Sequence, residues 1–265
     1  MDARGNVALA EHVNFVPGAT GRFVGQFSTD QTTLAGTWTS GDGRRTLPFS
    51  LRRVAESVEL SGGQSNRYKV MVEYLHFRSA EPFYQALNQR LAKEAQARFN
   101  RLDALLKKQT AGSDDLGSAA WSKGVNVELI HADKSLVSLC DTSYSFTGGA
   151  HFNYNLSSGN WIWDGTRLRE LGVRDILKDD PAALKRLRDL CVRDLKRQKA
   201  GWPDDLKFDA KIPPPLNLTS AGVLFIFDPY LVSSFADGAM TVLIPYADLR
   251  DLIPQTGPAA RLADQ

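Results

Sequence analysis

The sequence predicts an α+β fold: an antiparallel or mixed sheet packed by two main helices and preceded by an N-terminal β-meander. Three observations support this class. Segments with the two-residue alternation of strands outnumber helical ones. Most consecutive strand-like segments are joined by connections too short for a parallel crossover. Two long segments place apolar residues at three- and four-residue spacing, which is typical of amphipathic helices packed on a sheet.

The composition is that of an ordinary globular protein. The chain has 265 residues, of which 43% are hydrophobic and 23% charged, and its formal net charge is +2. This small charge does not indicate a nucleic-acid partner. No apolar run approaches the length that crosses a bilayer, and residues 1–4 do not lead into a signal peptide. We therefore expect either a cytosolic protein or an exported one numbered after a removed signal.

The first segment, residues 1–57, is expected to form the β-meander. Glycine and aromatic residues alternate here, which indicates a small curved sheet with close backbone approach. A structural sheet is the favoured interpretation, and a binding surface centred on Trp38 is the alternative. A junction to the main domain is expected at 61–63. The predicted strands are 21–27, 34–38 and 47–51.

The main domain is expected over residues 58–253. It starts with a strand at 68–74 and continues with a long helix from Pro82, a favourable first-turn residue. A polar loop is expected at 109–122, before a short strand at 125–130. The apolar stripe of the helix consists of Phe83, Leu87, Leu91, Ala95, Phe99, Leu102 and Leu106.

The second helix follows Asp180-Pro181, an N-cap followed by a first-turn proline, and should extend to about Lys199. Its apolar face carries Leu184, Leu187, Cys191 and Leu195. The stiff segment 212–215 then reads as an extended connector. Two strands flank a loop beyond it, and a short helix closes the domain. The strands are predicted at 223–227 and 241–244, the closing helix at 247–253, and a frayed, flexible tail at 254–265.

The stretch from Ser143 to Asn155 organises the domain. Strand-like segments precede and follow it, at 135–146 and 152–163. Between them, Gly148 and Gly149 allow positive φ or a close approach of another segment.

Residues 147–151, Thr-Gly-Gly-Ala-His, together with the C-terminal segments Phe225–Tyr230 and Val242–Tyr246, resemble the RsiV-like and PdaC-associated family of bacterial envelope domains. A looser similarity covers 68–91, so that the resemblance extends over roughly 58–253. It implies a periplasmic or extracytoplasmic location, free or lipid-anchored. The member type it suggests is the outer domain of an anti-sigma factor that binds lysozyme. The chain shows neither the transmembrane helix nor the sigma-binding segment needed for signalling.

Histidine and carboxylate patterns give little indication of catalysis. His151 is interpreted as a hydrogen-bonding residue of the glycine turn, with a binding-surface role as the alternative. No nucleophile elbow, zinc-binding helix or phosphate-binding loop occurs, so no catalytic residue, metal site or cofactor is predicted. The histidines, His12, His76, His131 and His151, lack ligand spacing, and the carboxylates at 179–180, 204–205 and 228 fit turns and caps.

The chain has two cysteines, Cys140 on a predicted strand and Cys191 on the second helix. In an exported protein they could form a disulfide. Two buried free thiols fit the pattern equally and are slightly favoured, because a strand and a helix rarely meet the strict Cα spacing of a disulfide.

We therefore expect a non-enzymatic extracytoplasmic binding protein that recognises a lysozyme-like or other cell-wall hydrolase or toxin, as an inhibitor, immunity factor or sensor. The loop between the last two strands should carry its aromatic anchors. The alternative is a module that binds peptidoglycan glycan through exposed aromatic residues such as Trp161, Trp163 or Trp202, and a cell-wall-acting enzyme ranks third. The predicted binding residues are Tyr230, Phe235, His151, Trp161 and Trp163.

Overall fold

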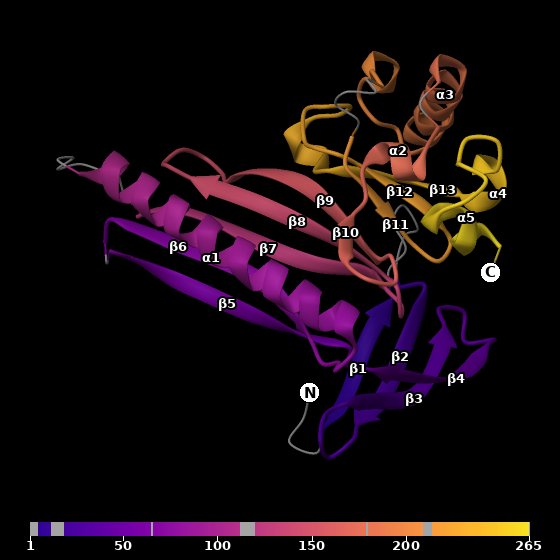
Figure 1. Cartoon of the computed structure of the whole chain (residues 1–265), viewed down its shortest axis with the longest axis horizontal. Coiled ribbons are helices and arrows are strands. Elements are labelled where there is room, and N and C mark those ends of the chain that lie inside the picture. The colour runs from indigo at the N-terminus through magenta and orange to yellow at the C-terminus, as the bar shows by residue number, and fades with distance from the viewer. Residues whose placement is uncertain are drawn as a thin grey trace. The chain divides into compact units, whose positions relative to one another are not determined.

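The computed structural model describes residues 5–11, 19–64, 66–111, 120–178, 180–208 and 214–264. The chain forms two compact units, Met1–Glu56 and Ser57–Gln265. Figure 1 shows their elements. The division falls one residue before the predicted boundary, and the predicted α+β class with a mixed sheet is confirmed.

The N-terminal unit is a four-stranded antiparallel sheet in the order β1-β2-β3-β4. The meander from Gly21 onward is as predicted, whereas β1 was missed. A Cβ on Gly36 would lie 2.1 Å from the carbonyl oxygen of Val24, so the glycine permits the close backbone approach expected from the sequence. Trp38 is half-buried against Gly21 and near Phe23, which favours the structural interpretation of this sheet. The strands are β1 (Asn6–Glu11), β2 (Gly21–Phe27), β3 (Thr33–Ser40) and β4 (Thr46–Arg52).

The larger unit is built around a six-stranded sheet in the order β10-β9-β8-β7-β6-β5. Strands β6 and β7 are parallel, and β7, β8, β9 and β10 are successively antiparallel. The junction predicted at 61–63 instead lies within β5. Gly62 is needed there because a Cβ would approach the Phe99 ring to 2.8 Å. The strands are β5 (Ala55–Gln64), β6 (Tyr68–Phe77), β7 (Trp121–Ala132), β8 (Leu136–Phe146), β9 (Asn153–Trp163) and β10 (Leu168–Glu170).

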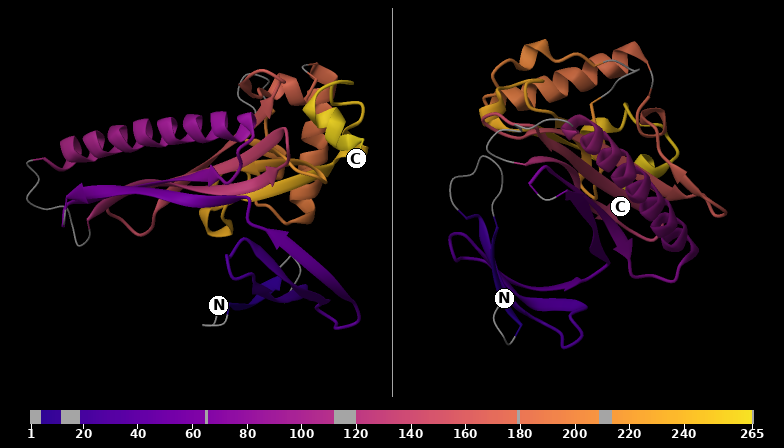
Figure 2. Two further views of the ribbon diagram at one scale, coloured as in Figure 1. Left: turned by 60° about the horizontal axis from the view of Figure 1, so that its bottom comes forward. Right: turned by 90° about the vertical axis from the view of Figure 1, so that its left-hand side faces the viewer.

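Helix α1 (Pro82–Thr110) connects β6 to β7 and runs along one face of this sheet (Figure 2). It extends into the predicted loop at 109–122, of which 112–119 lie outside the described residues. Leu87 is completely buried, which contributes roughly 1.5–3 kcal/mol. Asn88 donates to the carbonyl of Phe77 and accepts from its N–H, so the helix is also tied to β6. The predicted stripe is confirmed: Phe83, Leu87, Leu91, Ala95 and Leu106 are buried, and Phe99 and Leu102 are partly buried.

The C-terminal part contributes a three-stranded antiparallel sheet in the order β11-β12-β13, covered by α3 (Pro181–Arg197). The predicted N-cap is confirmed, since the Asp180 carboxylate accepts from the N–H groups of Ala182 and Ala183. Asp179 and residues 212–213 of the predicted connector lie outside the described residues. The other elements are α2 (Val173–Ile176), η1 (Pro203–Asp205), β11 (Leu216–Leu218), β12 (Gly222–Phe227), η2 (Phe235–Asp237), β13 (Met240–Pro245), α4 (Tyr246–Leu249) and α5 (Pro258–Ala263).

The C-terminal segment differs from its prediction. The closing helix ends at Leu249, and the expected frayed tail contains α5. Pro258 starts this helix, and Ala259 and Leu262 are 1% and 3% exposed within the core beside α3 and the three-stranded sheet. Burial of these apolar side chains explains why the proline- and alanine-rich C-terminal segment forms a helix.

A buried polar network joins the two sheets. Asn217 of β11 donates to the hydroxyl of Ser138 and the carbonyl of Leu139, both at 2.8 Å. Asn160 of β9 accepts from Ser138 and from the N–H of Leu218, and donates to the carbonyl of Leu216. Ser138, Asn160 and Asn217 are at most 4% exposed. Because buried amides without partners are costly, this network specifies how the sheets align.

Candidate functional site

The glycine turn between β8 and β9 is confirmed. Gly148 and Gly149 have φ values of 93° and 109°, a region in which side chains are strained. A Cβ on either would meet nothing within 4 Å, so the requirement for glycine comes from the backbone conformation rather than from crowding. The flanking strands pair in register, with Tyr144 opposite Tyr154.

The loop between β12 and β13 is attached to this hairpin at both of its ends. The carboxylate of Asp228 accepts from the N–H of Leu156 at 2.7 Å and from the side chain of Asn155 at 3.2 Å. At the other end, the N–H of Ala239 donates to the hydroxyl of Tyr154 at 3.1 Å. Two segments that are distant in sequence are therefore neighbours in the fold.

Phe235 is the centre of the aromatic contacts between the two segments. The His151 ring stacks on it with centroids 3.9 Å apart and an interplanar angle of 21°. Tyr154 and Tyr230 approach the same ring at 5.6 and 5.7 Å. His151 is exposed, and its Nδ1 lies 2.8 Å from the carbonyl of Phe152, which requires Nδ1 to carry the proton. His151 therefore makes the hydrogen bond expected of a turn residue, and its side chain is also exposed on the surface.

A second set of rings lies on the hairpin itself. Phe152 approaches Phe146 at 5.0 Å and Tyr144 at 6.0 Å. The Tyr144 ring lies over Gly124 of β7, where a Cβ would be 2.4 Å from the phenol oxygen. We call the two sets together the aromatic surface: Tyr144, Phe146, His151, Phe152, Tyr154, Tyr230 and Phe235.

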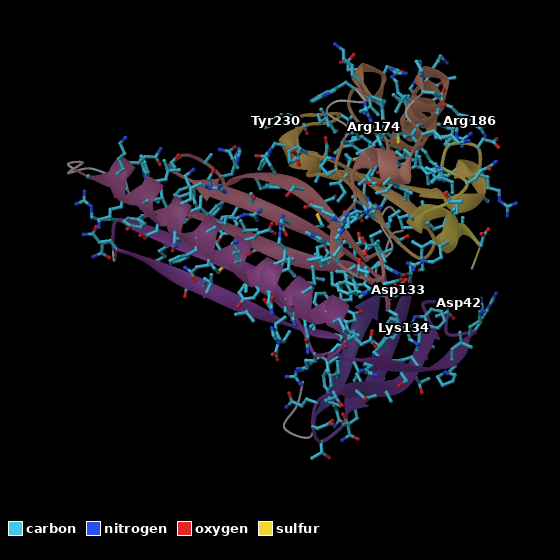
Figure 3. The ribbon with its side chains drawn as sticks, in the orientation of Figure 1. Asp42, Asp133, Lys134, Arg174, Arg186 and Tyr230 are labelled. Atoms are coloured by element: carbon cyan, nitrogen blue, oxygen red, sulfur yellow. The ribbon has the colours of Figure 1, made fainter. Side chains whose placement is uncertain are left out.

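The aromatic surface exposes several apolar side chains to solvent. Tyr230 is 61% exposed, Phe152 49% and Leu231 46%. Figure 3 shows Tyr230 on the loop between β12 and β13. Tyr230 has a φ of 71°, an uncommon value for a residue with a side chain, while its N–H donates to the carbonyl of Ser233. Backbone strain that presents an exposed aromatic ring is more typical of a recognition site than of a packing residue.

Acidic groups surround the strands that carry these rings. Burial, and then the charges of Glu73 and Glu59, raise the pKa of Tyr144. Burial raises the pKa of Cys140 to about 11, assisted by Glu128, Asp141 and Asp228. Glu59 and Glu73 thus lie near Tyr144 of the aromatic surface. A shallow depression of about 510 Å³ lies beside it, lined by Met71, Asn126, Thr142, Tyr144, Phe152 and Tyr154.

The predicted tryptophans are not part of this surface. Trp161 is only 7% exposed and lines the cavity under α1, so its expected role as an exposed aromatic was wrong. Residue 161 points toward the helix because successive strand residues alternate between faces. Trp163 is half-buried where β9 pairs with β10, and Trp202 is 38% exposed before η1.

The remaining reactive side chains do not form a cluster. In the part of the chain that the structure describes, no group of three or more His, Cys, Asp and Glu residues could hold a metal ion. His131 lies near Asp133, His76 is exposed on β6, and His12 is outside the described residues. Cys140 and Cys191 are buried and unpaired. No helix of the described residues is long and apolar enough to cross a membrane.

Comparison with known families divides the larger unit in two. Residues 62–154 match a family described as Deacetylase PdaC, and residues 174–247 match one described as Protein of unknown function (DUF3298). The chain carries a PdaC domain and a DUF3298 domain. The aromatic surface combines both: His151 and Tyr154 lie in the PdaC domain, and Tyr230 and Phe235 in the DUF3298 domain.

Solved structures support the fold of this pair. A DUF3298 family member from Bacteroides fragilis is 16% identical with a TM-score of 0.54, over 80% of this chain and 98% of that one. A DUF3298 family protein from Pseudomonas aeruginosa is 18% identical with a TM-score of 0.56, over 76% and 94%. Among curated proteins no match is found. At these identities the likeness is one of fold alone.

The sequence indicated His151, Tyr230 and Phe235 separately, without their contact. It did not indicate Phe152, Tyr154 or the hydrogen bonds by which Asp228 attaches the loop to the hairpin. Tyr154 and Phe235 are each one of several aromatic residues along the chain, and only the tertiary fold shows which rings meet.

Proposed function

We propose that the chain is a non-enzymatic, extracytoplasmic binding protein that recognises a lysozyme-like or other cell-wall hydrolase through the aromatic surface. It would act as an inhibitor, an immunity factor or a sensor. The observation that carries this proposal is the meeting of the glycine hairpin and the β12–β13 loop, which brings the exposed side chains of Tyr230 and Phe152 into the aromatic surface. The resemblance to envelope domains that sense lysozyme supports the class of partner.

The chemistry of the surface suits a protein partner. Tyrosine and phenylalanine are enriched at the centre of interfaces, where a few such anchors supply most of the affinity. The hydrogen bonds from Leu156 and Ala239 hold the loop before a partner arrives, which reduces the entropy lost on binding. The carboxylates of Glu59 and Glu73 near Tyr144 favour a partner that presents basic groups.

Binding is preferred over catalysis because of how His151 is placed. Its imidazole stacks on Phe235, and its Nδ1 proton is donated to a backbone carbonyl. A hydrogen bond of this kind can also orient a general base, whose Nε2 must then face a nucleophile or water. The stacking of the His151 ring on Phe235 is what favours a binding role. The stacked ring is an element of an apolar surface.

The test is the double variant Tyr230→Ala/Phe235→Ala, assayed against a panel of purified lysozyme-like hydrolases by biolayer interferometry. We expect the native chain to bind at least one hydrolase and the variant to bind it at least tenfold more weakly, a change of about 1.4 kcal/mol. Circular dichroism should show an unchanged fold. The control is Leu243→Ala, which removes another exposed apolar side chain, 46% exposed on β13, and should bind like the native chain.

Two results would contradict the proposal. If the double variant binds the hydrolase with native affinity, the aromatic surface is not part of the interface. Binding of purified glycan strands by the intact chain, with no hydrolase of the panel bound, favours a glycan-binding module instead.

A further inference from the structure

Strand β13 is an edge strand of the three-stranded sheet. Among the described residues it is paired with β12 on one side and with no strand on the other. A groove of about 370 Å³ lies beside it, between residues 242–245 of the strand and Arg193, Asp194 and Arg197 of α3. An unpaired strand edge is a template on which another strand can pair.

The hydrogen bonds of β12 show which backbone groups of β13 point outward. The N–H of Ile226 donates to the carbonyl of Pro215, so Ile226 directs its groups toward β11. Thr241 lies opposite Ile226. Because opposite residues of an antiparallel pair either exchange hydrogen bonds or both point away, Thr241 directs its groups away from β12. Leu243 and Pro245 do the same, since the direction alternates along the strand.

Only some of these outward groups are available. The side-chain amide of Gln198 already donates to the carbonyl of Thr241 at 2.8 Å. Pro245 has no N–H. The N–H of Thr241 and both backbone groups of Leu243 have no hydrogen-bond partner among the described residues. The Leu243 side chain is 46% exposed, so the open part of the edge is centred on this residue.

This pattern is complementary to itself. When Leu243 lies opposite Leu243 of a second, antiparallel copy, the N–H of each donates to the carbonyl of the other, and the N–H of Thr241 faces the carbonyl of Pro245. The donor that Pro245 lacks would have faced the carbonyl of Thr241, which Gln198 already satisfies. Registers centred on Thr241 or on Val242 would instead direct an N–H at that occupied carbonyl.

The charges beside the edge also favour a second copy. Gln198 follows the end of α3 and bonds to Thr241, so Arg197 lies toward that end of the groove, whereas Asp248 follows the other end of β13. A two-fold axis at Leu243 exchanges the two ends. Asp248, which is exposed and has no ion-pair partner in the part of the chain that the structure describes, is thereby brought to the arginine end of the other copy.

We propose that two copies of the chain associate through β13, which joins their three-stranded sheets into one continuous antiparallel sheet with Leu243 on the two-fold axis. The interface contains no residue of the aromatic surface, so it does not depend on the proposed function. A single pair of strands buries little surface, and the dimer is therefore weak.

The experiment is analytical ultracentrifugation of the full chain over a range of concentrations. We expect the average mass to rise toward that of a dimer between roughly 10 µM and 1 mM. Leu243→Lys and Leu243→Asp should each remain monomeric, because like charges would face each other on the axis. An equimolar mixture of the two variants should dimerise, since lysine then faces aspartate. Leu231→Lys is the matched control: Leu231 is also 46% exposed but is not on the edge, so this variant should dimerise like the native chain.

A cysteine at the axis tests the register. Opposite residues of such a pair have Cα atoms about 5.5 Å apart, which a disulfide can bridge. Leu243→Cys should therefore form a covalent dimer under mild oxidation, seen on a non-reducing gel, whereas Tyr230→Cys, exposed on the aromatic surface, should not. The native thiols are buried and should not contribute.

Three results would overturn the proposal: a chain that is still monomeric at 1 mM, native dimerisation of Leu243→Lys, or a mixture of the lysine and aspartate variants that remains monomeric. The last result also shows whether either variant lost the dimer merely by misfolding, because misfolded chains would not recover it together. At the dilutions of an interferometry assay the chain is monomeric, so this test and that of hydrolase binding are independent.

Discussion

Two glycines allow aromatic rings to lie flat on opposite faces of the six-stranded sheet. Gly124 lies under the Tyr144 ring, and Gly159 lies under the indole of Trp161. In both places a Cβ would overlap ring atoms, at 2.4 and 1.9 Å. The sequence drew attention to the Gly148-Gly149 pair because adjacent glycines indicate a turn. Single glycines within strands give no such signal, since their role depends on the neighbouring side chain that covers them.

At the turn itself, Gly149→Val should lower the free energy of unfolding by roughly 1–3 kcal/mol, because valine is strained at a φ of 109°. No clash contributes, since the space around the position is open. Urea denaturation followed by circular dichroism measures the change. Ala150→Val is the control, because it places the same valine side chain at the next position, which is also exposed. Equal stability of Gly149→Val and the native chain would show that the turn is not constrained.

The helices were the most predictable elements. Both long helices were found from apolar spacing and proline at the first turn. The buried stripe of α1 matches the prediction. In α3, Leu187, Cys191 and Leu195 are buried as predicted, but Leu184 is only half-buried. β1 and α5 were missed because each is only 6 residues long, and their stability comes from pairing with β2 and from docking on the core, respectively. Such contacts between distant segments cannot be predicted from the residues of β1 or α5 alone.

The two cysteines lie on elements that the sequence did predict, Cys140 on β8 and Cys191 on α3. Burial raises the pKa of Cys140 to about 11 and raises that of Cys191 further above its usual value. At pH 8 the native thiols should therefore react with a disulfide reagent about a hundredfold more slowly than in 6 M guanidinium. Absorbance of the released thiolate measures both rates. Alkylation in guanidinium without reductant should add two labels to the mass, and the absence of labels would show that the residues form a disulfide.

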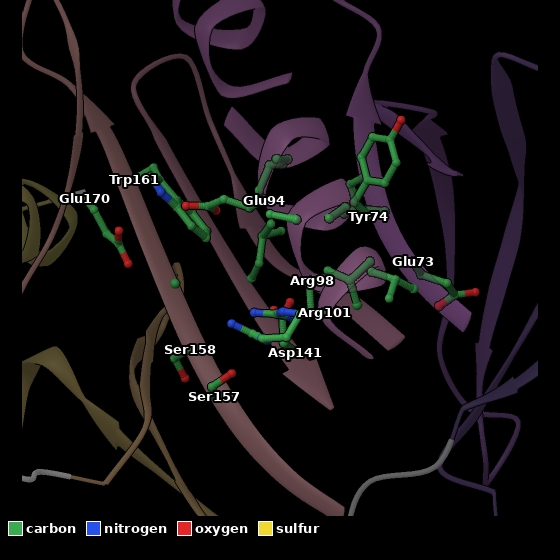
Figure 4. Close-up of a pocket in the computed structure, with 18 residues that line it drawn as sticks. Glu73, Tyr74, Glu94, Arg98, Arg101, Asp141, Ser157, Ser158, Trp161 and Glu170 are labelled. Carbon is green, nitrogen blue, oxygen red and sulfur yellow. The ribbon is translucent and has the colours of Figure 1, made fainter. Parts of the chain in front are cut away.

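At the scale of the whole molecule, the fold class was predictable. The contact between the Gly148-Gly149 hairpin and the β12–β13 loop was not. Tyr154 meets Phe235, and Asp228 caps Leu156, only because β11, β12 and β13 pack against the sheet that carries β9. Helix α1 covers the opposite face of that sheet and buries Trp161 (Figure 4), which could not be placed from sequence alternation alone. Alternation shows which residues share a face, but not which face is covered.

The carboxylate of Asp133, at the β7–β8 turn, is expected to contribute to stability in a pH-dependent way. The Asp133 carboxylate accepts hydrogen bonds from the N–H groups of Ser135 and Leu136. It also lies near the ring of His131 and forms an ion pair with Arg261 of α5. Figure 3 labels its position. Burial opposes its ionisation, but the hydrogen bond from His131, that from Ser135 and the charge of Arg261 together hold the pKa of Asp133 well below its usual value. A depressed folded-state pKa stabilises the fold above the unfolded pKa of about 4 and ceases to do so as the pH falls through the folded value.

Asp133→Asn keeps an acceptor for the turn but removes the charge. We expect the variant to be less stable than the native chain at pH 7, and the difference to shrink steadily from about pH 4 downward. Urea denaturation at pH 7, 5, 3 and 2 gives the two curves. Asp264→Asn, which removes an exposed carboxylate just after α5, should follow the native curve at every pH. A constant difference between Asp133→Asn and the native chain would contradict a role for this charge.

The amide network between the sheets has a consequence for inheritance. Ser138 belongs to the segment that matches PdaC, Asn217 to the segment that matches DUF3298, and Asn160 to the stretch between them. A gene that acquired one segment alone would encode a sheet with unmatched buried amides and an uncovered apolar face. Recombination that separates the two segments should therefore destabilise the product, and we expect the segments to be inherited together.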